Sequence, residues 1–514
     1  MFYSILFPNK EKSEEKRCSD EPECFKDLNL NQIFAPLLEA KAEFELNGFF
    51  YTSLHDPAVI VYRQDVMREL ENRELCKLFS DFSGSVYTID RKMDKLREAL
   101  SSDNDWENNY LSKGRLLDYA DRYCAAVSAL TKGLSAFKLR SAGLRGFCEY
   151  LFSYCRSDHY ISLREHIKHL RAGFSEVKYC MLINKGTVRV RRFEEQADHS
   201  EQILSCFEKF RQGDVQNYQR RLSEEPSAEH IEADVLNLLS KLYKDLFSEL
   251  DTFCSEYFRF DDEIILRFSR EIQFYLSWFE YIRPLREAGL PMCYPEICEK
   301  ADNIYILDGY DIVLASMLSR KTVINDFRIE KPKQIIVVTG PNQGGKTTYA
   351  RAFGQIHYLG MLGLCVPGRE AALYLFDRIY THFEREENLA ALSGKLQDDL
   401  IRLHDLLGRA TSKSIIIINE IFSSTTLTDA LVLGGHMMDA ISALGAPAVI
   451  VTFLDELACY NEKTISMMST VDEEDPSSRT FKIIPKPPDG LAYAMYIARR
   501  HGLTYEQLCG RLKK

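Results

Sequence analysis

Residues 339–348 form a glycine-rich loop whose residue types suit the binding of a polyphosphate. Gly340 is followed, after four residues, by Gly345, Lys346 and Thr347, which is the spacing of a phosphate-binding P-loop. Glycines allow a tight turn in which successive backbone N–H groups point at phosphate oxygens. In such loops the lysine contacts the β- and γ-phosphates and the threonine hydroxyl binds Mg²⁺. The pattern therefore predicts a nucleoside triphosphate site that uses Lys346, Thr347 and magnesium.

The segments on either side of the loop suit that chemistry. Residues 334–338 are apolar and mostly β-branched, which predicts a buried strand, and residues 349–353 begin a helical pattern. A helix that begins near Lys346 would add its positive N-terminal end to the anion site. A glycine turn that matched the motif by chance would lack this strand–loop–helix context.

A second polar pair follows the isoleucine-rich run 414–418. Four consecutive isoleucines predict a buried strand, and ligands of parallel sheets bind at the carboxyl ends of the strands. NTPases of this kind place an aspartate there for the Mg²⁺ shell and then a residue that positions water. We predict Glu420 as the general base, whereas Asn419 brings no charge and should hold Mg²⁺ less well. A strand end without a catalytic role is the alternative.

Composition limits the class of protein. The 514 residues suffice for two to four domains, and 45% hydrophobic with 27% charged residues are ordinary globular values. A net charge of −11 argues against a generally basic nucleic-acid binder, so any DNA contact must come from a local patch or a clamp-like geometry. The chain has no apolar run of the roughly 18 residues that a membrane span needs. We therefore expect a cytoplasmic protein without membrane contact.

The pattern along the chain predicts a multidomain protein, mostly α-helical at first and α/β at its C-terminal end. We expect a leader over residues 1–30, a helical core and lever domain over 31–300, and an ATPase domain over 301–514. Within the helical part, residues 227–256 predict one long helix, and a second, 264–282, is expected to end at Pro284. Loop-forming residues 82–85 predict an interruption. Strands at 304–307, 334–338, 414–418 and 447–452 predict a parallel sheet with helices on both faces.

A β-hairpin is predicted near residues 178–193, where valines alternate with arginines. Lys185, Arg189, Arg191 and Arg192 make it the densest basic patch of the chain. A solvated hairpin face and a phosphate-contacting face are both compatible with this pattern.

The amino-acid sequence of the glycine loop resembles that of one ATPase family. Thr339-Gly340-Pro341-Asn342-Gln343-Gly344-Gly345-Lys346-Thr347-Thr348 is similar to the nucleotide loop of MutS DNA mismatch-repair ATPases, in which a methionine usually stands in place of Gln343. Residues 323–326, including Asn325, resemble the family's adenine-packing segment. Residues 419–429 resemble its Asp-Glu-x-Gly-x-Gly-Thr stretch, and 452–457 its Thr-His-x-x-Glu-Leu switch.

The resemblance implies ATP and Mg²⁺ as cofactors and an ABC-type P-loop ATPase domain. It further implies a homodimer, with Ser393 as the candidate that contacts the partner's γ-phosphate, and DNA as a partner in mismatch repair or a branched-DNA task. We expect the family's N-terminal mismatch-recognition domain to be missing. Asn419 and Phe453 depart from the family's aspartate and histidine, and Phe422, Ser423 and Ser424 from its Gly-x-Gly.

These departures favour a slow ATPase and leave two alternatives open. One is a nucleotide-gated scaffold with little hydrolysis. The other is an ABC- or SMC-like ATPase that acts on a protein partner.

Overall fold

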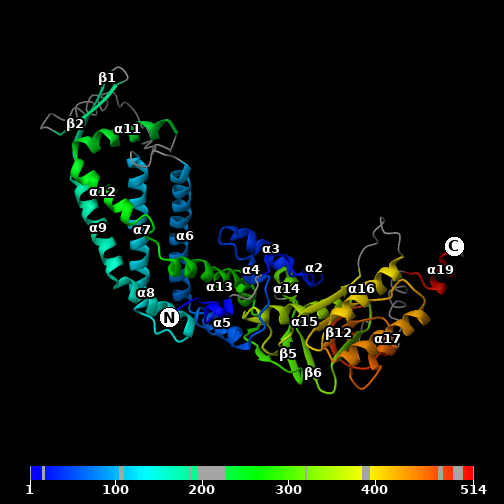
Figure 1. Ribbon diagram of the computed structural model, residues 1–514. Helices are drawn as coiled ribbons and strands as arrows, with labels where there is room; N and C mark the ends of the chain where they lie inside the picture. Colours follow the sequence, from blue (N-terminus) through cyan, green and yellow to red (C-terminus); the bar gives the residue numbers. More distant parts are fainter. Residues whose placement is uncertain are drawn as a thin grey trace. The chain divides into compact units, whose positions relative to one another are not determined.

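The chain folds into two units, each assembled from segments that are far apart in the sequence (Figure 1). The computed structural model describes residues 2–13, 18–102, 109–184, 187–193, 226–318, 321–384, 394–472, 478–489 and 502–512. The first unit comprises residues 77–138 and 146–270, and the second residues 2–76, 139–145 and 271–514. These units do not follow the predicted boundaries at 30 and 300, although the functional assignment of the three predicted regions stays a prediction.

The first unit is built from amphipathic helices. In α7 (Tyr110–Leu134) the apolar residues recur every three or four positions and are buried, and the Asn109 side chain caps the helix by accepting from the Ser112 N–H. The other helices lying wholly in this unit are α9 (Asp158–Ser175), α11 (Pro226–Leu242) and α12 (Lys244–Glu256). Helices α6 (Arg73–Ser102), α8 (Ala142–Cys155) and α13 (Glu263–Glu287) continue beyond it at one end.

The predicted hairpin is present and packs on α11 (Figure 1). Strands β1 (Tyr179–Asn184) and β2 (Thr187–Arg192) pair antiparallel. The single helix predicted over 227–256 is wrong, because it breaks at Tyr243 into α11 and α12. The Tyr243 hydroxyl donates to the Lys178 carbonyl (2.7 Å), and the Arg192 guanidinium donates to the Leu242 carbonyl (2.7 Å). The Arg192 contact thus satisfies the Leu242 carbonyl at the break, and the Tyr243 contact ties the break to the start of the hairpin.

Conversely, two helix ends that the sequence predicts are absent. Residues 82–85 lie inside α6, where the Ser85 hydroxyl donates to the Asp81 carbonyl and the Thr88 hydroxyl to the Gly84 carbonyl, both at 2.8 Å. Such bonds to the preceding turn satisfy hydroxyls within a helix. Helix α13 likewise continues past Pro284 to Glu287.

The second unit contains a six-stranded sheet in the order β10-β11-β12-β7-β13-β14, parallel except for the edge strand β14. Side chains from alternate positions of these strands face opposite helices. Ile416 and Ile418 pack with α16 and α17, whereas Ile417 faces α15 at Gly354. The sheet thus has the predicted helices on both faces. The strands are β7 (Ile335–Thr339), β10 (Ile379–Phe383), β11 (Ile415–Asn419), β12 (Ala448–Val451), β13 (Thr464–Val471) and β14 (Arg479–Pro485), and the helices α15 (Lys346–Met361), α16 (Lys395–Arg409) and α17 (Leu427–Leu444).

The strand predicted at 304–307 exists but does not belong to the parallel sheet. It is part of β5, which lies in a four-stranded sheet of order β4-β9-β5-β6 and runs antiparallel to both of its neighbours. Its bounds do not reveal which sheet it joins, because that choice depends on partners elsewhere in the chain. The remaining strands are β3 (Met292–Cys293), β4 (Glu296–Cys298), β5 (Asn303–Gly309), β6 (Asn325–Glu330), β8 (Val366–Pro367) and β9 (Glu370–Tyr374).

The N-terminal residues are part of the second unit's core, which corrects the predicted leader. Ile5 is fully buried, and its N–H donates to the Glu271 carboxylate (3.0 Å). Leu28 is also fully buried, and its carbonyl accepts from Gln355 of α15 (2.8 Å). The prediction of a leader rested on the charged residues that follow residue 9, and it overlooked the apolar residues on either side of them. The helices of this part are α1 (Lys10–Ser13), α2 (Phe25–Leu28), α3 (Asn31–Ala40), η1 (Ala42–Phe44), α4 (Asn47–Phe50) and α5 (Pro57–Glu69).

In the described part of the second unit there are also three short helices, α14 (Ile312–Leu318), η4 (Asp455–Cys459) and α19 (Tyr505–Leu512). Among the residues that the structure describes, no helix combines the length and apolarity needed to cross a bilayer.

Candidate nucleotide-binding site

The glycine loop connects the carboxyl end of β7 to the first turn of α15, as predicted. Gly340 and Gly345 have φ of +109° and +89°, a region that residues with a Cβ rarely adopt. A Cβ on Gly344 would lie 2.1 Å from the Ser469 Oγ, so close approach rather than dihedral angle requires glycine there. Glycine is thus needed at Gly340 and Gly345 because of the positive φ, and at Gly344 because a Cβ would have no space.

Lys346 lies inside the curve of the loop and is 4% exposed. Its ammonium donates to the carbonyls of Gly340 (2.9 Å) and Pro341 (3.2 Å) and to the Asn342 Oδ1 (3.3 Å). Burial lowers the pKa of Lys346, and the nearby charge of Glu420 opposes that shift. The lysine is therefore held by neutral acceptors that an incoming anion could replace.

The predicted magnesium residues lie next to each other. The Thr347 hydroxyl donates to the Asn419 Oδ1 (2.8 Å), joining the start of α15 to the end of β11. The hydroxyl and amide oxygens suit Mg²⁺ that takes its other ligands from phosphates and water. Among the described residues no group of three or more His, Cys, Asp or Glu side chains forms a closed metal site. These residues therefore fit a magnesium that arrives with a nucleotide.

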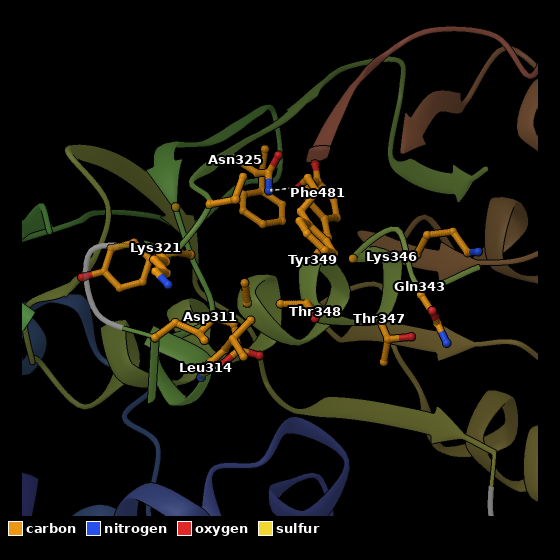
Figure 2. A pocket seen from close by; sticks show the side chains of 17 residues that line it. Asp311, Leu314, Lys321, Asn325, Gln343, Lys346, Thr347, Thr348, Tyr349 and Phe481 are labelled. Atoms are coloured by element: carbon orange, nitrogen blue, oxygen red, sulfur yellow. Dashed lines mark hydrogen bonds between the residues drawn. The ribbon is translucent and has the colours of Figure 1, made fainter. Parts of the chain in front are cut away.

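A cavity of about 390 Å³ extends from the glycine loop (Figure 2). Gln343, Lys346, Thr347 and Thr348 lie at its loop end. Its remaining walls are mostly apolar and aromatic, which suits a flat heterocycle. They are formed by Gly309, Tyr310, Asp311, Leu314, Leu318, Lys321, Val323, Asn325, Phe327, Gly345, Tyr349, Ala352 and Phe481.

Asn325, predicted from the adenine-packing segment, lines this cavity and joins two sheets. Its amide donates to the Phe481 carbonyl (3.2 Å), and its Oδ1 accepts from the Ile483 N–H (2.9 Å). The edge strands β6 and β14 are thereby tied together beside the pocket.

Comparison with known proteins agrees with this geometry. The family model MutS domain V matches residues 336–503, which include the glycine loop, β11 and β14. The chain thus contains a MutS domain V.

Proteins named DNA mismatch repair protein MutS are among its relatives. The one from Chlorobium phaeobacteroides is 28% identical over 42% of this chain and 25% of its own length. The one from Lactobacillus johnsonii is 27% identical over 42% of this chain and 26% of its own length. That from Bacillus licheniformis is 27% identical over 58% of this chain and 32% of its own length. The matches thus span a quarter to a third of these relatives.

The turn after β11 shows how this chain accommodates its departures from the MutS pattern. Glu420 and Phe422 have φ of +54° and +62°, although neither is glycine. Phe422 stands where the resemblance placed the first glycine of Gly-x-Gly. The positive φ of this position explains why the family has a glycine there. The Phe422 side chain is 1% exposed and packs into the core beneath α17. Packing offsets the backbone strain here.

Sequence reasoning missed three residues that β13 and β14 bring to the loop. Ser469 donates from its hydroxyl to the Gly344 carbonyl (2.7 Å), and the Arg479 Nε donates to the Asn342 carbonyl (3.2 Å). Phe481 adds an aromatic ring to the cavity wall. These strands lie over 120 residues beyond the loop in sequence, and no local pattern links them to it.

Of two further predicted positions, the structure describes only Phe453. Ser393 lies outside the described residues, so the structure does not test it. Phe453, in place of the MutS histidine, is 47% exposed and offers no hydrogen-bonding group at its side chain.

Proposed function

We propose that the chain binds Mg²⁺-ATP at residues 340–348 and hydrolyses it slowly, in an ABC-type ATPase domain. The observation that carries this proposal is the buried ammonium of Lys346 inside the glycine loop, with the Thr347–Asn419 pair beside it. Magnesium would neutralise phosphate charge when bound.

Each side chain then has a distinct role. Lys346 exchanges its carbonyl and amide acceptors for β- and γ-phosphate oxygens, while the α15 N-terminus adds its positive end. Thr347 and Asn419 would hold the metal, and Asn419 would offer it a neutral oxygen only. Glu420 takes the proton of the attacking water, and its position directly after β11 puts it at the same edge of the sheet. Gly340, Pro341, Asn342, Gln343, Gly344, Gly345 and Thr348 form the remainder of the phosphate loop.

Substitution of the base separates chemistry from binding. In Glu420→Gln we expect ATP turnover to fall about 100-fold or more while ATP affinity stays within a few-fold. Glu462→Gln, the same change at an exposed loop residue, should keep full turnover. In Lys346→Ala both binding and turnover should be lost. Unchanged turnover in Glu420→Gln would remove Glu420 from the mechanism.

A second candidate function is a nucleotide-gated scaffold. It is favoured by Asn419, which lacks the charge of the family's aspartate, and by Phe453, which lacks the polar group of the family's histidine. Wild-type protein that binds ATP yet gives no phosphate release above the Lys346→Ala background would support the scaffold and not the enzyme.

We further propose a homodimer in which Ser393 of each protomer completes the partner's site, and a DNA ligand of the mismatched or branched kind. The relatives' names and the implied family architecture support this, as does the basic hairpin of the first unit. An ABC- or SMC-like action on a protein partner is the alternative. We also propose that the protein is located in the cytoplasm.

A binding panel tests the DNA part. Duplex, mismatched and branched DNA of equal length are titrated at two stated salt concentrations, with and without ATP. We expect tighter binding of at least one DNA form and a nucleotide-dependent change. Absence of binding to all three would favour the protein-partner alternative.

A further inference from the structure

The cavity beside the glycine loop contains one carboxylate among largely apolar walls, that of Asp311. Asp311 is 5% exposed and lies directly before α14. Figure 2 shows it with Leu314 on one side of the cavity, facing Asn325, Phe481 and Tyr349 on the other. A buried carboxylate needs compensating hydrogen bonds, and their arrangement determines what it can still bind.

One oxygen of this carboxylate is fully occupied. Asp311 Oδ1 accepts from the backbone N–H groups of Val313 (2.9 Å) and Leu314 (3.0 Å) and from the Gln355 side-chain amide (3.1 Å). Gln355 is itself fully buried, and its amide is committed, since it also accepts from the Ile312 N–H (3.0 Å) and donates to the Leu28 carbonyl (2.8 Å). The orientation of the carboxylate is therefore fixed.

The other oxygen has no hydrogen-bond partner among the described residues, and the side chain lines the cavity. Burial raises the pKa of Asp311, whereas the hydrogen bonds to Oδ1 and the charge of Arg351 favour the ionised form. Because the ionised carboxylate only accepts hydrogen bonds, Oδ2 in that form selects a ligand edge that offers a donor.

The position of Asp311 relative to Lys346 indicates which part of a nucleotide would face its Oδ2. Gln355 follows Lys346 by nine residues, which corresponds to about 13 Å along the helix axis. Lys346 marks the phosphate end, so Asp311 lies near the opposite end of the ligand. Leu314, Val323 and Phe327 supply the apolar surface that the faces of a base require.

We propose that Asp311 is a specificity-determining residue, whose Oδ2 accepts one hydrogen bond from the exocyclic amino group of adenine. This rests on the proposed binding of ATP at the site and adds the residue that distinguishes adenine from other bases. Guanine presents a carbonyl at the corresponding position, which a carboxylate repels. Guanine can also offer two adjacent donors, but those need both carboxylate oxygens, and Oδ1 is already occupied.

Base analogues test the inference on unmodified protein. Affinities are measured calorimetrically with Mg²⁺ for ATP, GTP, inosine triphosphate and purine riboside triphosphate, which lacks the amino group. Loss of one hydrogen bond to a charged acceptor should weaken purine riboside triphosphate about tenfold or more relative to ATP. GTP and inosine triphosphate should bind more weakly still. Equal affinity for ATP and purine riboside triphosphate, or tighter binding of GTP, overturns the inference.

A substitution gives an independent check. Asp311→Asn retains an oxygen for the α14 cap but presents an amide donor to the cavity. We expect it to reverse the preference, weakening ATP and strengthening inosine triphosphate, with the thermal midpoint of the ligand-free protein nearly unchanged. Asp308→Asn, the same change at a carboxylate that pairs with Arg369 outside this cavity, should keep the wild-type order. An unaltered order of affinities in Asp311→Asn contradicts the inference.

Failure of this inference is distinguishable from failure of the proposed function. If ATP binds and Lys346→Ala abolishes binding, the nucleotide function stands whatever the analogues show. If no triphosphate binds, both fall together.

Discussion

At the scale of single residues, the proposed site keeps the residue types for phosphate contacts and has a neutral residue at one metal position. Lys346 and Thr347 have the neighbours that nucleotide binding needs. Asn419 is 7% exposed at the end of β11, where a carboxylate would bring a full negative charge close to the metal. Binding of the nucleotide and turnover of the nucleotide can therefore be separated at this one residue.

Asn419→Asp should strengthen magnesium binding. The added carboxylate keeps an oxygen for the Thr347 hydroxyl and contributes charge that hard cations prefer. We expect half-saturation of Mg²⁺-dependent ATP binding at several-fold lower Mg²⁺, with equal or faster turnover. Asn303→Asp adds the same charge at an exposed position of β5 and should change neither. An unaltered Mg²⁺ dependence in Asn419→Asp would mean that residue 419 lies outside the metal shell.

Phe422 combines a strained backbone with a buried ring, and substitution distinguishes the two. Removing the ring costs about 3–5 kcal/mol of unfolding free energy, and a glycine recovers about 1–2 kcal/mol by relieving the positive φ. We expect Phe422→Gly to destabilise by about 2–3 kcal/mol, and Phe422→Ala to destabilise more. Urea unfolding of both variants checks this. Alanine that is less destabilising than glycine would contradict the strain.

At the scale of elements, α15 begins at the proposed phosphate site and is mostly buried. Thirteen of its 16 residues are buried. His357 is fully buried there; its Nδ1 donates to the Phe353 carbonyl (2.8 Å), and its Nε2 has no hydrogen-bond partner among the described residues. Burial lowers the pKa of His357 to about 4.

This shift predicts acid sensitivity with a defined sign. The folded protein keeps His357 neutral down to about pH 4, whereas the unfolded chain takes up a proton below about pH 6.5. Stability present above pH 6.5 is therefore lost as the pH falls towards 4, by about 3 kcal/mol. His357→Phe should remove that loss, as seen by urea unfolding at pH 7 and 4.5. His404→Phe, at an exposed site, should keep it. Equal acid sensitivity of wild type and His357→Phe would contradict the assignment.

The strands and the helix that carry the proposed site could be predicted from the sequence, whereas the residues that β13 and β14 bring to it could not. The strand before the loop, the helix after it and the isoleucine strand were predictable, because each carries a local periodicity and a motif. Ser469, Arg479 and Phe481 were not, because sheet order brings them to the loop and sequence order does not reveal sheet order. Helix α6 was misjudged at residues 82–85 because hydroxyls that favour turns can also bond to the preceding helical turn.

At the scale of the whole molecule, the net charge of −11 opposes DNA binding, so the proposed contact must be local. On β2 the residues alternate between faces. Val190 packs towards α11 and Arg192 lies over the Tyr243 ring, whereas Arg189 and Arg191 are exposed and occupy the opposite face. Two guanidinium groups therefore project from one side of the hairpin, without the aromatic contact that holds Arg192.

The double variant Arg189→Glu/Arg191→Glu tests whether this face contacts phosphates. If both arginines neutralise phosphates, the slope of log K against log salt should fall by about 2, and DNA affinity should drop at low salt. ATP affinity should stay unchanged, because the nucleotide residues belong to the second unit. Lys132→Glu/Lys138→Glu makes the same charge change at exposed positions of the first unit. If both double variants weaken DNA equally, general repulsion accounts for the loss, and the hairpin face is then only solvated.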